Sequence, residues 1–118
     1  VSLGDVASAH TVSFPTSLSI SRSPSGTVAT GTRVTFSGKL SSKKAACVKR
    51  SKIQLIRVGE GVVATRKTND RGKYSFRVAV NQTARWKTRF PGKVLTAAHP
   101  HNHTCKRSVS DRIRVPVG

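Results

Sequence analysis

The sequence predicts an all-β protein, an antiparallel sandwich of two sheets built from about seven short strands. Short runs of residues alternate between apolar and polar side chains, which is the period of a strand with one buried face. Turn-forming residues separate these runs, Val, Ile, Thr, Ser and Gly dominate the composition, and no stretch has a convincing helical period. The length of 118 residues suits one domain with one core.

The N-terminal third contains an arm and two predicted strands. Residues 1–16 show no sustained period and are expected to form an arm or linker, so the predicted domain spans residues 17–118. Leu18 and Ile20 alternate with Ser and Thr and predict the first strand. TRVTFSGKL (32–40) alternates throughout and predicts the second strand, with its apolar residues facing inward.

Five further runs complete the predicted sandwich. KIQLIRV (52–58) carries apolar residues on both faces, which indicates a central strand. VVATRKT (62–68) is a short strand, and the tight turn NDRGK follows it, because Asn, Asp and Gly tolerate the left-handed geometry of a hairpin. The remaining strands are YSFRVAV (74–80), RWKTRF (85–90) and DRIRVPV (111–117).

The charge balance is strongly basic. The chain has 22 Lys and Arg against four acidic residues, a formal net charge of +18. So few carboxylates cannot pair so many cations, and the resulting field attracts anionic partners. Nucleic acid, anionic cell-wall polymer, glycan and acidic membrane surfaces all qualify as partners. The alternative is a highly charged surface that only keeps the protein soluble.

The two cysteines, Cys47 and Cys105, are widely separated and form no metal-binding pair. In a small β-rich chain they predict one disulfide, and therefore an oxidising, secreted or cell-surface location. Two buried thiols in a cytosolic protein are the alternative. No run approaches the ~18 apolar residues of a membrane span, and the N-terminal residues lack the pattern of a signal peptide, which is expected of a mature form or an excised domain.

The run ARWKTRFP places like charges on one face of a predicted strand. Arg85, Lys87 and Arg89 fall on one side, and Trp86 and Phe90 fall on the other, inward side. A row of repelling cations has no obvious structural use. We interpret it as a binding feature, and the alternative is a solvated basic face that guards against edge pairing.

The segment Thr68 to Val80, TNDRGKYSFRVAV, resembles the T-x-D-x-x-G-x-[YF]-x-[FV]-x-V signature of bacterial immunoglobulin-like and prealbumin-like surface domains. SLSISRSPSGTVATGTRVTFSGKL is similar to the opening strands of those domains, and RWKTRFPG to a later strand. The resemblance covers roughly residues 17–118 and implies an immunoglobulin-like sandwich. Such sandwiches serve many functions. Unlike those usually neutral or acidic, cysteine-free domains, this chain is basic and has two cysteines.

An immunoglobulin-like layout implies where the cations gather. It places the third, sixth and seventh strands side by side in one sheet, so that a cationic face forms on its outer side. The members of this predicted polyanion-binding face are Lys52, Arg85, Lys87, Arg89, Arg112 and Arg114. The layout also brings the loops 41–51 and 91–110 to the same end, which supports a Cys47–Cys105 disulfide. A second predicted cationic patch at that end comprises Lys43, Lys44, Lys49, Arg50, Lys106 and Arg107.

Other chemistries have little support in the sequence. His99, His101 and His103 lie close to Cys105 and are weak candidates for metal ligands, because a structural zinc site needs four ligands. The simpler interpretation is that these histidines add positive charge at mildly acidic pH. No nucleophile motif, carboxylate pair or phosphate-binding loop is present, so we expect neither an enzyme nor a cofactor.

The sequence therefore predicts a non-catalytic, secreted or cell-envelope module, expected to be a monomer, that binds polyanions. The alternative is a protein–protein interaction module, an adhesin or secreted inhibitor, that acts on an acidic partner through the 91–111 loop. The inward aromatic residues leave no stacking platform for bases, so nucleic-acid binding would be nonspecific.

Overall fold

The computed structural model describes residues 11–95 and 102–118, and most of these residues are in strands. One short helix, α1 (Ala45–Val48), lies in the predicted 41–51 loop. The strands are β1 (Thr11–Phe14), β2 (Thr16–Leu18), β3 (Ser21–Ser23), β4 (Thr32–Ser42), β5 (Lys52–Arg57), β6 (Gly61–Lys67), β7 (Lys73–Val80), β8 (Ala84–Phe90), β9 (Lys93–Leu95), β10 (Asn102–Cys105), β11 (Ser108–Val109) and β12 (Ile113–Val115). The all-β prediction is confirmed.

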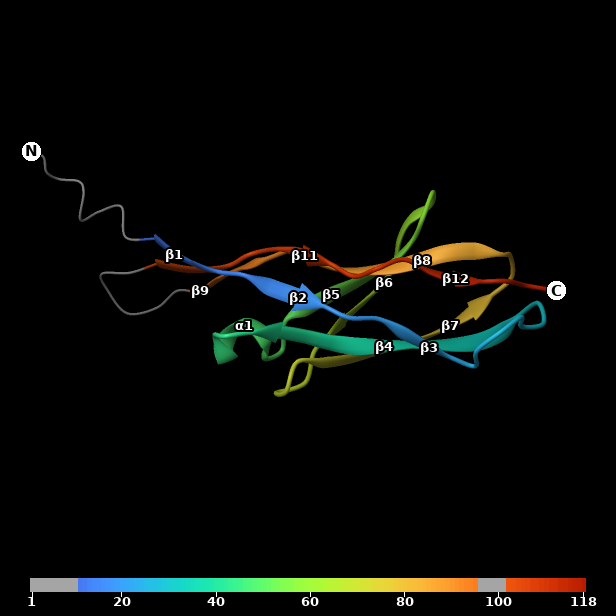
Figure 1. Cartoon of the computed structure of the whole chain (residues 1–118), viewed down its shortest axis with the longest axis horizontal. Coiled ribbons are helices and arrows are strands. Elements are labelled where there is room, and N and C mark those ends of the chain that lie inside the picture. Colours follow the sequence, from blue (N-terminus) through green and yellow to red (C-terminus); the bar gives the residue numbers. More distant parts are fainter. Residues whose placement is uncertain (1–10, 96–101) are drawn as a thin grey trace, which may run out of the picture.

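Most strands form two layers, one above the other in Figure 1. In the lower layer β4 pairs with β2 and β3 along one edge and with β7 along the other, all antiparallel. In the upper layer the order is β11 and β12, then β8, β5 and β6, again antiparallel. The predicted third, sixth and seventh strands therefore do lie side by side, as β5, β8 and β12. This architecture is compatible with a β-sandwich.

The core lies between the layers and follows the predicted alternation. Val34, Phe36 and Leu40 of β4 are fully buried, and Trp86 and Phe90 of β8 face them from the other layer. The rings of Phe36 and Trp86 are 5.0 Å apart between centroids. The central position predicted for 52–58 is confirmed, because β5 lies between β6 and β8 and buries apolar residues on both faces.

The predicted first strand is interrupted, and Tyr74 explains the break. Its hydroxyl donates a hydrogen bond to the carbonyl of Ser19, between β2 and β3. The amide of Lys39, opposite, donates instead to the Ser19 side chain at 3.0 Å. Gly38 permits this arrangement, because a Cβ there would lie 2.0 Å from the Ser19 carbonyl oxygen and 2.7 Å from the Tyr74 hydroxyl.

The NDRGK turn joins the two layers, which differs from the hairpin expected from its residues. The strands before and after it are not paired, because β6 pairs with β5 and β7 pairs with β4. Asn69 closes the turn by accepting hydrogen bonds from the amides of Arg71 and Lys73, and Gly72 adopts the left-handed conformation. Thr68 fixes the end of β6 by exchanging hydrogen bonds with Ser51.

Two segments expected to lack regular structure form a third, smaller sheet. β9 and β10, within the predicted 91–110 loop, pair antiparallel, and β1, within the predicted arm, pairs with β10 in parallel. The pairing continues where the amide of Lys106 donates to the carbonyl of Phe14 at 2.9 Å. Strands of three or four residues are too short to produce a clear alternation, so the pattern did not indicate them. This sheet prolongs the molecule at one end in Figure 1, and the principal extents are 65 × 27 × 17 Å.

Candidate functional site

The outer side of the upper layer carries the predicted cationic face, which we call the β8 face. Trp86, Thr88 and Phe90 point into the core, so the residues between them point outward. Arg85 is exposed and lies directly opposite Arg114 of β12, also exposed. Like charges in such positions are about 5 Å apart at Cβ and repel one another.

The other outward residues of β8 have different surroundings. Arg89 is half-buried, and its Nε donates a hydrogen bond of 2.8 Å to Oε1 of Gln54, its partner on β5. Lys87 is partly exposed and lies opposite Ile56. The sequence placed both residues on the correct face. It did not indicate that Arg89 is held in position by a neighbour, whereas Arg85 forms no ion pair within residues 11–95 and 102–118.

The β8 face contains one more cation than predicted. Lys52 at the start of β5 is exposed, and it lies directly opposite Lys67 of β6, which is exposed as well. Lys67 was missed because its partner depends on the β5–β6 register, which shifts at a bulge between Leu55 and Ile56. Arg112 is exposed just before β12.

These charges form no ion pair among the described residues. The ion pairs there are Arg57–Glu60 at 2.7 Å and Arg50–Asp70 at 3.4 Å. Neither includes a cation of the β8 face. An anion that approached this face would therefore meet cations that repel one another and that are not ion-paired in the part of the chain that the structure describes.

The opposite side of the molecule carries a second set of cations that the sequence pattern alone did not connect with a site. On the outer side of β4 and β7, Lys39 lies directly opposite Lys73, and both are exposed. Arg33 and Arg77 are exposed on the same outer side. We call this surface the β4 face. The alternation of β4 and β7 indicated the outward direction of these residues, but only the register brings them together.

The predicted disulfide is present. Cys47 of α1 and Cys105 of β10 are bonded with an S–S distance of 2.00 Å, and both are buried. Lys93 of β9 makes a further contact with the end of α1. Its Nζ donates hydrogen bonds of 3.0 Å to the carbonyls of Ala46 and Lys49, which are left without helical partners at the end of α1.

The cations predicted at this end differ in their individual surroundings, and their role as one binding patch stays a prediction. Lys44 lies with its Nζ 5.8 Å from the centre of the Phe14 ring, and Arg50 pairs with Asp70. Lys43 lines one hollow, whereas Lys106 and Arg107 line another. Lys49 is exposed, and its carbonyl accepts the bond from Lys93.

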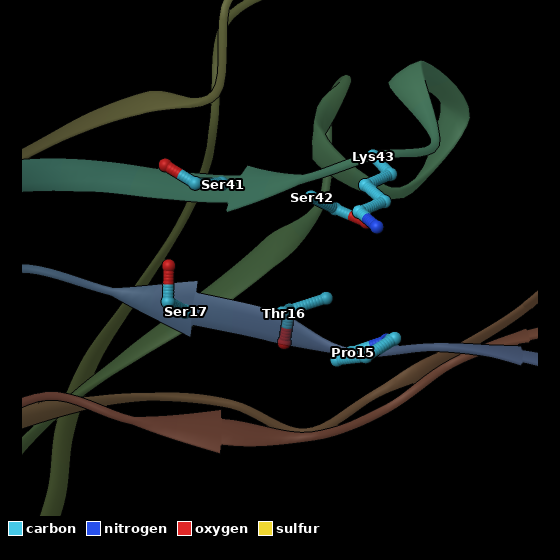
Figure 2. A pocket seen from close by; sticks show the side chains of 6 residues that line it. All are labelled: Pro15, Thr16, Ser17, Ser41, Ser42 and Lys43. Atoms are coloured by element: carbon cyan, nitrogen blue, oxygen red, sulfur yellow. The ribbon is translucent and has the colours of Figure 1, made fainter.

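The hollow beside Lys43 lies between β2 and the end of β4 and measures about 440 Å³ (Figure 2). Its lining is mostly hydroxyl-bearing: Pro15, Thr16, Ser17, Ser41, Ser42 and Lys43. Thr16 already donates to the Lys106 carbonyl at 2.7 Å, and Ser42 accepts from the Lys44 amide at 3.2 Å. None of the described residues that line this hollow has a carboxylate or an imidazole, so these residues offer no acid–base pair.

One histidine of the predicted cluster, His103, lies among the described residues. His99 and His101 lie outside the described residues, so the weak metal-ligand prediction for them stays a prediction. His103 on β10 is half-buried, and its ring meets Phe14 edge to face at 5.4 Å between centroids. Among the described residues no group of three or more His, Cys, Asp or Glu side chains is placed to hold a metal ion.

Burial raises the pKa of Tyr74, although its hydrogen bond with Thr88 acts in the opposite direction. This residue is in the core rather than on either cationic face.

Comparisons with protein-family models, with curated proteins and with solved structures find no match for this chain. Within residues 11–95 and 102–118, no helix has the length and apolar character needed to cross a membrane.

Proposed function

We propose that this protein is a non-catalytic immunoglobulin-like module, secreted or held at a bacterial cell surface, that binds polyanions through its β8 face. The observation that carries the proposal is the juxtaposition of Arg85 and Arg114 on adjacent strands, with Lys87 and Arg89 continuing the row. Their mutual repulsion costs folding free energy, and a bound anionic polymer would relieve it.

The surroundings of these cations support a nonspecific, electrostatic mode of binding. Trp86, Tyr74 and Phe90 are buried, so they offer no exposed ring on which a base could stack. Contacts with phosphate, sulfate or carboxylate groups would then supply most of the affinity. Affinity that depends on such contacts falls as salt rises, because binding releases counterions.

The remaining parts of the proposal rest on topology and on the disulfide. The order of β12, β8, β5 and β6 in one layer and β3, β4 and β7 in the other supports an immunoglobulin-like layout. The Cys47–Cys105 bond supports an oxidising, extracytoplasmic location. We propose a monomer, since the charge of like copies opposes association.

Retention on a heparin column across a salt gradient tests the proposal. The Arg85→Gln/Arg114→Gln variant removes two charges from the β8 face while keeping much of each aliphatic stem. The matched control is Arg22→Gln/Arg66→Gln, which removes two charges whose cross-strand partners, Phe36 and Ile53, are not cations. We expect the β8-face variant to elute at clearly lower salt than the control. Equal elution of the two variants would mean that retention depends only on the total net charge of the protein and not on the β8 face.

A second candidate function, recognition of an acidic protein, rests on the β9–β10 hairpin. The hairpin prolongs one end of the molecule, and Val94 on it is 66% exposed. A protein ligand held there would be lost on Val94→Glu, whereas Arg85→Gln/Arg114→Gln would leave it bound. The opposite result would favour the β8 face.

A further inference from the structure

The β4 face repeats, on the other side of the molecule, the feature that distinguishes the β8 face. Lys39 and Lys73 are directly opposed on neighbouring strands, as Arg85 and Arg114 are. All four side chains are exposed. Each face therefore carries a cross-strand pair of like charges, with further cations beside it and no ion pair among the described residues to neutralise it.

The β4 face also has a chemical character of its own. Between its cations run rows of small hydroxyl side chains, set by the register of β3, β4 and β7. The rows are Ser21–Ser37–Ser75 and Ser23–Thr35, and the second row ends at Arg77. The hydroxyls of Ser21 and Ser37 are 3.4 Å apart. Small side chains leave the long cationic ones accessible, and hydroxyls can both donate to and accept from a sugar ring or its acidic substituents.

The two faces look in opposite directions. β8 and β4 lie in different layers (Figure 1), and both direct their apolar residues toward the shared core. One linear chain bound along the outer side of the upper layer cannot reach the lower layer without bending sharply around an edge. Two chains can bind at once, because about 10 Å of packed core separates the sheets.

We infer that this protein bridges two chains of an anionic polysaccharide, one on the β8 face and one on the β4 face. The inference rests on the proposed function and extends it from binding to cross-linking. An anionic glycan suits the hydroxyl rows and the buried aromatics better than a nucleic acid does, because base stacking has no exposed platform on either face. Linking two chains multiplies the effective affinity of each contact with a dense polymer layer.

Stoichiometry and light scattering with heparin test this inference. The probes are a heparin hexasaccharide for titration calorimetry and unfractionated heparin for scattering. Three variants with equal net charge are compared: Arg85→Gln/Arg114→Gln on the β8 face, Lys39→Gln/Lys73→Gln on the β4 face, and Arg22→Gln/Arg66→Gln as the control, whose cross-strand partners are Phe36 and Ile53. Circular dichroism establishes that each variant is folded.

We expect the parent protein and the control to bind about two hexasaccharides and each face variant to bind about one. With long heparin, the parent and the control should scatter strongly, because bridged chains form networks, and both face variants should lose most of the scattering while still binding. Equal scattering of all three variants would overturn the inference, because neutralisation of the heparin by the protein's total net charge would then explain the scattering.

Other outcomes separate this inference from the proposed function. A single site that only the β8-face variant removes would overturn bridging and leave the proposed function standing. No salt-dependent binding of heparin at all would overturn both. Displacement of the hexasaccharide by duplex DNA at equal charge concentration, without preference for the glycan, would overturn the choice of an anionic polysaccharide.

Discussion

The hydroxyl of Tyr74 on β7 lies 3.0 Å from Oγ1 of Thr88 on β8, and this hydrogen bond joins the two layers inside the core. The same hydroxyl donates to the Ser19 carbonyl. Thr88 is held in turn from the edge of its layer, because its amide donates to the Ser110 hydroxyl at 2.8 Å. The neutral phenol is thus part of a buried polar network that connects β7 and β8 with Ser19 and Ser110.

The stability contribution of Tyr74 should depend on alkaline pH. Burial raises its pKa in the folded protein above the ordinary value of about 10. As pH rises above about 10, the unfolded chain releases the phenolic proton while the folded chain keeps it, so the free energy of unfolding falls.

We expect Tyr74→Phe to be about 1–2 kcal/mol less stable than the parent at neutral pH. That deficit should shrink as pH rises above about 10. Urea unfolding of both proteins across this range measures the difference, and lysine deprotonation, common to both, cancels in it. A constant deficit would contradict the prediction.

Replacing Gly38 by Ala should severely destabilise the fold. The added Cβ would lie 2.0 Å from the Ser19 carbonyl oxygen, which is backbone and cannot move aside without breaking the contact between β2 and β4. We expect a loss of about 3 kcal/mol or more, or no folded protein. Ser75→Ala, on the exposed side of β7, should change stability by less than about 0.5 kcal/mol and is the control. A Gly38→Ala protein as stable as this control would show that the close approach is not required.

Lys93 should stabilise the end of α1 locally. Replacement by Met keeps the aliphatic stem and leaves the carbonyls of Ala46 and Lys49 without their cationic donor. We expect a loss of about 2 kcal/mol, since hydrogen bonds to charged groups contribute about 1.5–3 kcal/mol each. Hydrogen exchange should accelerate in residues 45–50 and not in β4 or β7. Lys106→Met, which alters an exposed lysine, provides the control and should leave exchange in 45–50 unchanged.

Removal of the disulfide should destabilise the protein more than any single surface change. The bond closes a segment with a sequence separation of 58. The chain-entropy treatment gives about 4 kcal/mol for a loop of this size. We expect Cys47→Ser/Cys105→Ser to lower the free energy of unfolding by about that amount, measured by urea denaturation. A parent protein treated with reductant should match the double variant, and a loss below about 1 kcal/mol would contradict the prediction.

Alternation alone predicted much of the fold. Val34, Phe36 and Leu40 on β4 and Trp86 and Phe90 on β8 are buried as expected, because a sheet with one face in a core imposes a period of two. The short strands around the disulfide could not be predicted in this way. β1, β9 and β10 are held by pairing with one another, and sequence alternation over three or four residues carries little information.

Sequence alternation also predicts only part of the candidate sites. The outward direction of Arg85 and Arg114 follows from alternation, and the resemblance placed their strands side by side. Their direct opposition depends on register, and so does the pairing of Lys39 with Lys73. Register depends on contacts between distant segments, and a single sequence does not display it.

The position of Arg85 directly opposite Arg114 should lower the stability of the free protein and strengthen its binding to anions. We expect Arg114→Gln to raise the free energy of unfolding by about 0.2–1 kcal/mol at low salt, because it removes the repulsion between directly opposed cations. The gain should disappear in high salt, which screens exposed charges. The same variant should elute earlier from heparin. Urea unfolding at two salt concentrations measures the first effect.

Arg66→Gln is the matched control for this prediction. Arg66 is exposed on a strand of the same layer, but its cross-strand partner is Ile53 and not a cation. It should therefore gain little stability at low salt. A double-mutant cycle between Arg85→Gln and Arg114→Gln isolates the pairwise term. A repulsive coupling at low salt that vanishes at high salt would show that the two charges oppose each other in the free protein. The absence of coupling would mean that the side chains diverge enough to avoid each other, and the β8 face would then need no anion to relieve it.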